Sequence, residues 1–87
     1  LNFSGKILDF GGGNGEFCKY VFNKLPDSKI VLYEPTPSLN MEASANLKSY
    51  PSIQIISRIE NLPFNSFDII FCMEVFEHIV EEQYITL

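Results

Sequence analysis

Cysteine is scarce in this sequence of 87 residues, which holds only Cys18 and Cys72. The two cysteines lie far apart and belong to no CxxC or Cys/His pattern, so neither a disulfide framework nor a zinc site is expected. No basic side chain is placed to stabilise a thiolate at either position. We therefore expect two buried core thiols in a protein of a reducing compartment, the cytoplasm.

Basic residues and long apolar runs are also few. Six Lys and Arg stand against eleven Asp and Glu, and the resulting net charge of −5 argues against nucleic acid as a partner. The apolar runs are only a few residues long, whereas a membrane-spanning helix needs roughly 20, so no membrane span is expected. Because the sequence starts at Leu1 without a basic and apolar leader, no signal peptide is expected, and a longer parent chain is allowed for.

The sequence does contain enough apolar material for one small domain, since 46% of its residues are hydrophobic and 20% are charged. Short apolar runs, turn residues and helical patterns follow one another in an order that predicts an α/β fold with a parallel sheet. The segment 58–66 is too short for a crossover between neighbouring parallel strands, so the third and fourth strands need not be adjacent. The expected strands cover residues 6–10, 30–33, 53–56 and 67–73.

Helical spacing of apolar residues predicts three helices. The first follows the glycines near position 15 and ends at about Leu25, before Pro26. The second starts near Ser38, whose hydroxyl can cap it, and runs to about Tyr50. The third lies at the end of the chain.

A glycine cluster follows the first expected strand and is the strongest sign of a ligand site. Glycines let the backbone turn sharply and let a ligand come close, and the start of the next helix offers unpaired N–H groups. The dinucleotide pattern G-x-G-x-x-G is not satisfied, because its third glycine would fall on Glu16 or Cys18, and a Walker P-loop is absent. The spacing is D-x-G-x-G-x-G, formed by Asp9, Gly11, Gly13 and Gly15.

An acidic residue, Glu34, ends the second expected strand. In nucleotide-binding α/β folds, a carboxylate at this position can accept hydrogen bonds from both hydroxyls of a ribose. The alternative is a solvated loop carboxylate. Because Glu34 and the glycine cluster fall at the same end of adjacent strands, we favour ribose binding.

Four blocks of this sequence resemble, in order and approximate spacing, the class I S-adenosylmethionine-dependent methyltransferases, particularly their small-molecule branch. The blocks cover nearly the whole chain. The resemblance implies a Rossmann-like doubly wound parallel sheet with strand order 3-2-1-4 and three helices, S-adenosylmethionine as cofactor and a small-molecule methyl acceptor. The blocks are residues 7–15, residues 31–35, residues 60–64, and residues 67–70 running into 74–79.

The resemblance also implies roles for individual residues. Glu34 would hold the ribose hydroxyls, Pro35 would lie against the adenine, and the backbone around Ile59 would meet the adenine edge. Arg58 departs from the family's pattern, because many relatives carry there an acidic residue that accepts the adenine amino group. The methionine half of the cofactor would be lined by Asp9, Gly11, Gly13 and Gly15, and the sulfonium side would be flanked by Cys72 and Met73.

Methyl transfer from a sulfonium is an in-line displacement with a good leaving group, so the protein has mainly to align acceptor and methyl group in a dry pocket. If the acceptor is a hydroxyl, His78 or Glu74 could act as general base. For His78 we favour the alternative of a residue that packs and bonds locally at a helix start. Glu74, His78, Glu81 and Glu82 fall on about one face of the last helix, which we interpret as a solvated acidic face and not as a metal site.

Two other functions stay open. A non-catalytic cofactor-binding or interaction domain is suggested by Arg58 and by the short chain, and a nicotinamide-dependent oxidoreductase is disfavoured by Glu16 in place of the third glycine.

The family's sheet normally has seven strands. The resemblance therefore implies that residues 1–87 are the cofactor-binding half of a domain that continues past Leu87, with a fourth strand at an exposed edge. Such an edge favours association with the missing half or with another copy of the chain.

Overall fold

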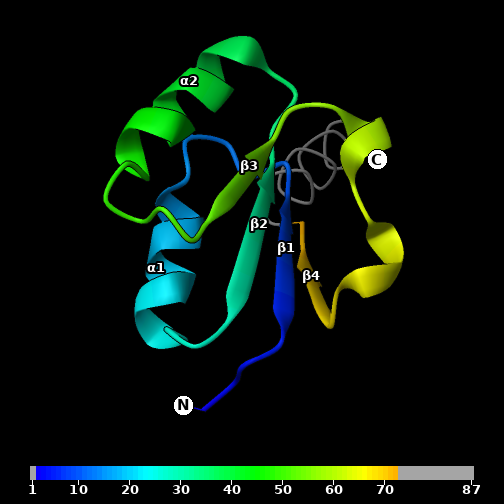
Figure 1. The fold of residues 1–87 in the computed structure, drawn as a ribbon. Coiled ribbons are helices and arrows are strands. Elements are labelled where there is room, and N and C mark those ends of the chain that lie inside the picture. Colours follow the sequence, from blue (N-terminus) through cyan, green and yellow to red (C-terminus); the bar gives the residue numbers. More distant parts are fainter. Residues whose placement is uncertain (1, 73–87) are drawn as a thin grey trace, which may run out of the picture.

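The computed structural model describes residues 2–72. These residues form a parallel sheet whose strands lie side by side in the order β3-β2-β1-β4 (Figure 1), which confirms the predicted order 3-2-1-4. All five residues of β1 pair with β2, whereas only three of them pair with β4. The strands are β1 (Lys6–Phe10), β2 (Lys29–Tyr33), β3 (Gln54–Ile56) and β4 (Ile69–Phe71).

Two α-helices connect the first three strands and lie on one face of the sheet (Figure 1). α1 (Glu16–Lys24) matches its prediction, and α2 (Pro37–Asn46) starts one residue before Ser38 and ends before Tyr50. The predicted cap by Ser38 is wrong, because Thr36 is the N-cap residue and Pro37 is the first residue of the helix. Proline suits that place, since its φ is preset and its missing N–H would have no helical partner. The predicted third helix lies outside the described residues.

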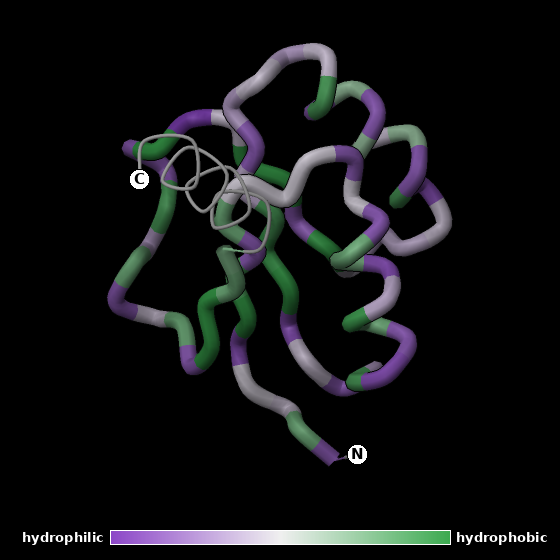
Figure 2. Tube along the Cα trace, turned by 180° about the vertical axis from the view of Figure 1, so that it is seen from behind, coloured by the Kyte–Doolittle hydropathy of each residue, from purple (hydrophilic) through white to green (hydrophobic). Residues whose placement is uncertain are grey.

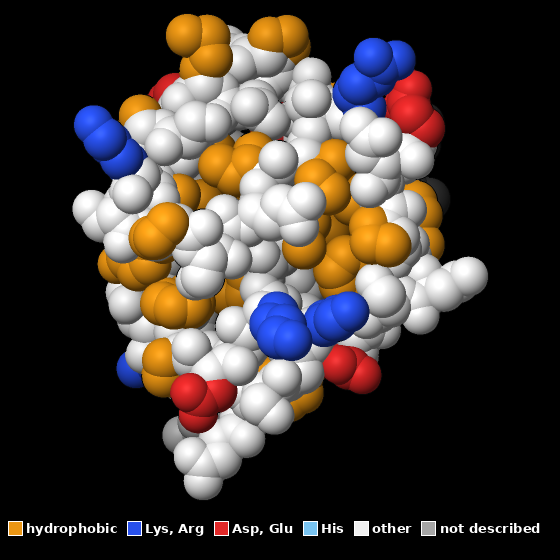
Figure 3. Space-filling model, viewed as in Figure 1, with side chains coloured by type: hydrophobic (Ala, Val, Ile, Leu, Met, Phe, Trp, Pro, Cys, Tyr) orange, Lys and Arg blue, Asp and Glu red, His pale blue; other side chains and the backbone are white. Residues whose placement is uncertain are grey.

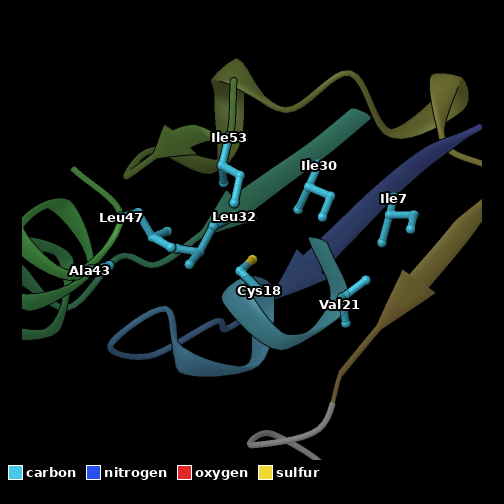
Figure 4. Packing of buried hydrophobic residues seen from close by; sticks show 8 residues of the cluster. All are labelled: Ile7, Cys18, Val21, Ile30, Leu32, Ala43, Leu47 and Ile53. Carbon is cyan, nitrogen blue, oxygen red and sulfur yellow. The ribbon is translucent and has the colours of Figure 1, made fainter. Parts of the chain in front are cut away.

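An apolar layer fills the space between the sheet and the two helices (Figure 4). Alternate strand residues point to this face, so Ile7, Ile30 and Leu32 meet side chains from α1 and α2. Burying one such side chain contributes about 1.5–3 kcal/mol to stability. The helix residues in the cluster are Cys18 and Val21 of α1 and Ala43 of α2.

A second, smaller apolar cluster covers the other face of the sheet. It consists of Leu8, Tyr33, Ile56 and Leu62, with Phe67 packed against them. Leu62 and Phe67 belong to the segment between β3 and β4, which contains the short 3-10 helices η1 (Ile59–Asn61) and η2 (Phe64–Ser66). Figure 2 shows hydrophobic residues along the strands, as expected for strands covered on both faces.

The segment between β3 and β4 also carries the chain from one edge of the sheet to the other. β3 pairs with β2 and β4 pairs with β1, which confirms that the third and fourth strands are not neighbours. The segment is fastened to the start of β1, because Lys6 N donates to Asp68 Oδ2 at 2.8 Å and Asp68 N donates to Lys6 O at 2.8 Å. A few extended residues and two helical turns thus replace a full crossover helix.

β4 is an edge strand of the described sheet, as predicted. It ends at Phe71, earlier than the predicted end at Met73, which lies outside the described residues. The prediction of a buried Cys72 is wrong, because its side chain is exposed. Cys72 is exposed because it follows Phe71, the last residue of β4 that pairs with β1, and because β4 lies at an edge of the described sheet.

Hydrophobic side chains reach the surface in several places on the face shown in Figure 3. Scattered exposed apolar residues are normal for folded proteins. Among the helices of the described residues, none is long and apolar enough to cross a membrane. Among residues 2–72, the large exposed hydrophobic residues are Tyr20, Met41, Ile59, Phe64 and Ile70.

Candidate functional site

The loop between β1 and α1, residues 11–15, forms the predicted glycine site, and we call it the glycine loop. Gly11, Gly13 and Gly15 have φ angles of 76°, 60° and 87°. Side chains of L-residues rarely tolerate this left-handed region, and within the described residues only glycines adopt it. The alternating spacing of the three glycines therefore matches three alternating left-handed positions in the loop.

Gly12 is required for a different reason, which is space. A Cβ at this position would lie 2.5 Å from Leu32 Cγ and 3.0 Å from Asp9 Oδ2. The first distance is far shorter than van der Waals contact. The loop thus lies directly on β2, closer than any larger residue would allow.

The backbone of β2 fastens the first part of the glycine loop. Gly11 N and Gly12 N both donate to the carbonyl oxygen of Tyr33, at 2.8 and 3.0 Å. This carbonyl lies at the carboxyl end of β2, next to the end of β1 where the loop begins. The chain leaving β1 is thereby turned toward β2.

Glu34 fastens the next residue of the loop. Glu34 is only 4% exposed, and its Oε1 accepts a hydrogen bond from Gly13 N at 2.8 Å. Its Oε2 accepts a hydrogen bond from Thr36 N at 2.9 Å, at the entrance to α2. The structure thus brings Glu34 and the glycine loop together, as predicted. Because Glu34 is buried and bonded to two backbone N–H groups, it is not a solvated loop carboxylate.

Asp9 lies beneath the glycine loop and is only 3% exposed. Cys18 of α1 donates to Asp9 Oδ2 through its thiol, with an Sγ to Oδ2 distance of 3.4 Å. Burial, with the neighbouring charge and hydrogen bond of Asp9, raises the pKa of Cys18 far above its usual value. Cys18 is therefore a buried protonated thiol, as predicted, and not a nucleophile.

The other predicted cofactor contacts are more exposed. Pro35 follows Glu34 directly, and Ile59 opens η1 with half of its surface exposed. The end of β3 adjoins this region, since Glu34 N donates to Ile56 O at 3.0 Å. Arg58 forms an exposed ion pair with Glu60 at 3.1 Å.

Cys72 follows the end of β4, and the remaining predicted site residues Met73, Glu74 and His78 lie outside the described residues. Glu81 and Glu82, the other members of the acidic face, lie outside them as well. Residues 2–72 contain no group of three or more His, Cys, Asp or Glu side chains that could hold a metal ion.

Two asparagines of α2 also contact the site, and no sequence pattern indicated either of them. Asn40 Nδ2 donates to the carbonyl oxygen of Glu34 at 3.0 Å, and Asn46 Nδ2 donates to the carbonyl oxygen of Asn14 at 2.9 Å. A polar residue on a helix gives no local sign that it reaches a loop far away in the sequence. The long separation of Asn46 from Asn14 explains why no pattern revealed it.

A cleft of about 350 Å³ opens elsewhere, at the opposite end of the strands. Its lining includes Lys6 and Lys29, which begin β1 and β2, whereas the glycine loop follows the end of β1. The cleft is therefore separate from the glycine loop.

Comparisons with known proteins agree on one family. The profile of a family described as "Methyltransferase domain" matches residues 8–87. A malonyl-[acyl-carrier protein] O-methyltransferase from Ilyobacter polytropus is 31% identical over 78 residues, which are 87% of this chain and 29% of that protein.

Solved structures show the same fold. The mitomycin 7-O-methyltransferase MmcR matches with a TM-score of 0.60 and 26% identity, over 72% of this chain and 20% of that chain. The plantazolicin methyltransferase BpumL, solved in complex with SAH, matches with a TM-score of 0.62 and 23% identity, over 76% and 26% of the two chains. The present chain thus spans less than a third of the length of each of these relatives.

Proposed function

Because this chain belongs to the methyltransferase-domain family, we propose that it binds S-adenosylmethionine and forms the cofactor-binding part of a small-molecule methyltransferase. The observation that carries this proposal is the contact between Glu34 and the glycine loop. The buried carboxylate of Glu34, directly after β2, accepts a hydrogen bond from the N–H of Gly13, in the loop that follows the neighbouring strand β1. In open α/β sheets, ligands bind outside the carboxyl ends of the strands.

The residues present fit the cofactor. A carboxylate offers about four lone-pair positions, and one backbone N–H on each oxygen of Glu34 leaves acceptor capacity for the two hydroxyls of a ribose. Pro35 and the backbone of Ile59 would adjoin the adenine. The methionine half would lie along Gly11, Gly13 and Gly15 above Asp9, and Cys72 and Met73 would flank the sulfonium.

The bound cofactor would supply an activated methyl group. The chain's own residues would orient the cofactor and keep water out, and no nucleophilic side chain is required. This division of labour is consistent with Cys18, whose raised pKa leaves it protonated beneath the loop. His78 and Glu74 stay our candidates for a general base.

We further propose that residues 1–87 belong to a longer methyltransferase domain. Two observations support this: the chain covers less than a third of each relative's length, and β4 is an edge strand of the described sheet. Such an edge could pair with further strands of the same chain or with a second copy. Two relatives are named O-methyltransferases, which supports an oxygen atom as methyl acceptor.

We place the protein in the cytoplasm without a nucleic acid partner. The free thiols Cys18 and Cys72 support a reducing compartment, and the net charge of −5 disfavours binding to a phosphate backbone.

The proposal is tested by calorimetry on the full-length protein with SAH, the demethylated product of the cofactor. Wild type should bind, and Glu34→Ala should bind about 10- to 100-fold more weakly, because hydrogen bonds to a charged group are lost. Glu34→Gln keeps the shape of the side chain, and its affinity for SAH should lie between those of wild type and Glu34→Ala. Glu42→Gln, which neutralises an exposed carboxylate of α2, is the matched control and should bind like wild type.

Absence of SAH binding to wild type would contradict the proposal, as would unchanged binding in Glu34→Ala. Methyl transfer to a panel of phenol, carboxylic acid and amine acceptors then separates an enzyme from a non-catalytic cofactor-binding domain. Transfer to an oxygen acceptor is the expected result.

A further inference from the structure

The last turn of α2 packs directly against the second half of the glycine loop. Asn46, the final residue of the helix, donates from Nδ2 to the carbonyl oxygen of Asn14 at 2.9 Å. Leu47 lies so close to Gly15 that a Cβ there would be 3.0 Å from Leu47 Cδ1. Asn46 and Leu47, the last residue of α2 and its C-cap, therefore contact Asn14 and Gly15, two consecutive residues of the loop.

The Asn46 bond fixes one particular peptide group. The carbonyl of Asn14 shares its peptide plane with the N–H of Gly15, and this N–H donates to Gly12 O at 3.1 Å. The peptide is thus held from both sides, by Asn46 at its oxygen and by Gly12 at its nitrogen. Because Gly15 follows with a φ of 87°, and glycine resists rotation less than other residues, an outside bond is well placed to set the orientation of this peptide.

Asn46 also completes a series of contacts. Going along the loop, Gly11 and Gly12 are held by Tyr33 O, Gly13 is held by Glu34, and Asn14 is held by Asn46. All three anchors come from the unit formed by β2 and α2, so the shape of the loop after β1 is set by the next strand and helix. In this series Tyr33 acts through its backbone, whereas Glu34 and Asn46 act through their side chains.

We propose that Asn46 is a positioning residue of the cofactor site, which holds the Asn14–Gly15 peptide in the orientation that the cofactor binds. This inference rests on the proposed function, because it takes the glycine loop as the cofactor site. Asn46 acts through the loop backbone. The orientation of the peptide decides which loop groups face the ligand, and a loop that is already ordered loses less entropy on binding.

The test uses the full-length protein with three variants and two measurements. Asn46→Ala removes the donor, and Asn46→Asp keeps the shape but turns an oxygen toward the oxygen of Asn14. Asn23→Ala is the control, because it removes a long amide contact from α1 to Tyr50 Oη, at 3.4 Å, away from the loop. Calorimetry gives the Kd for SAH, and ¹H–¹⁵N spectra of the free protein report the amide signal of Gly15.

Asn46→Ala should raise the Kd about 3- to 10-fold, the range expected for the loss of one hydrogen bond, and Asn46→Asp should raise it further. Both variants should shift the Gly15 amide signal, since it belongs to the peptide that Asn46 holds. Asn23→Ala should change neither quantity. A general loss of stability would not single out the Gly15 signal.

An SAH affinity within twofold of wild type in both Asn46 variants would overturn the inference, and so would a Gly15 signal that does not move. Failure of wild type itself to bind SAH is a separate outcome. It would overturn the proposed function, and this inference with it.

Discussion

The two sides of the described sheet, the side of β2 and the side of β4, differ sharply in how well they are packed. On the side of β2, two helices cover the sheet, Leu32 is fully buried, and a side-chain hydrogen bond from Asn46 ties α2 to the glycine loop. On the side of β4, no helix of the described residues packs on Ile70, which is 48% exposed. The end of the sheet that carries the glycine loop is thus built within the first two strand–helix units, whereas β4 forms an edge of the described sheet.

The largest difference between the two regions is expected in the reactivity of their two cysteines. Cys72 at the end of β4 is exposed, whereas Cys18 beneath the glycine loop is buried and has a raised pKa. Because the thiolate is the reactive form, iodoacetamide at pH 8 should label Cys72 roughly 100-fold faster or more than Cys18. Mass spectrometry of the native protein over time measures both rates, and denaturant should remove the difference.

Equal labelling rates in the native state would contradict the burial of Cys18. Protection of both cysteines in the full-length protein would instead show that further chain covers β4.

Core truncation gives the next contrast. Leu32→Ala leaves a cavity between β2 and the helices and should lower the free energy of unfolding by about 2–5 kcal/mol. Ile70→Ala on β4 should cost less than about 1 kcal/mol, since half of its surface is exposed. Urea unfolding of both variants measures the difference, and a cost for Ile70→Ala close to that for Leu32→Ala would contradict an open β4 edge.

A methyl group added to the glycine loop tests how closely the loop lies on β2. Gly12→Ala would place a Cβ 2.5 Å from Leu32 Cγ, so a shift of the loop or of Leu32 is required. We expect a loss of about 1–3 kcal/mol in the free energy of unfolding, the usual cost of overpacking, together with weaker SAH binding. The double variant Gly12→Ala/Leu32→Ala should lose less stability than the sum of the losses in the two single variants. Additive losses would exclude the contact between position 12 and Leu32 as the cause.

Much of the better-packed region could be predicted from the sequence, because its signals are local. The apolar run of β1 and the turn residues after it predict a strand with the observed bounds 6–10, and the spacing of three glycines reflects three left-handed residues in one loop. Glu34 could be placed beside them, since parallel strands end at the same edge. These features need no knowledge of distant contacts.

The errors lie where distant neighbours decide the outcome. The exposure of Cys72 depends on what lies beside β4 and not on the apolar run that precedes it. The hydrogen bond from Asn46 to Asn14 depends on how the crossover places α2 above the loop, and its two residues are 32 positions apart. The start of α2 could have been predicted better, since Pro37 is a local signal for the first turn of a helix that outweighed the hydroxyl of Ser38.

The smallest effect is expected from the ion pair between Arg58 and Glu60, on the segment that leads toward β4. Both side chains are mostly exposed, and each can exchange its partner for water, so breaking the 3.1 Å contact by Glu60→Gln should change the free energy of unfolding by less than about 1 kcal/mol. Glu34→Gln alters a buried carboxylate that accepts two backbone N–H groups, so it should cost more in the same urea titration. Equal costs would show that the acidic residues of the two regions do not differ in their contribution to stability.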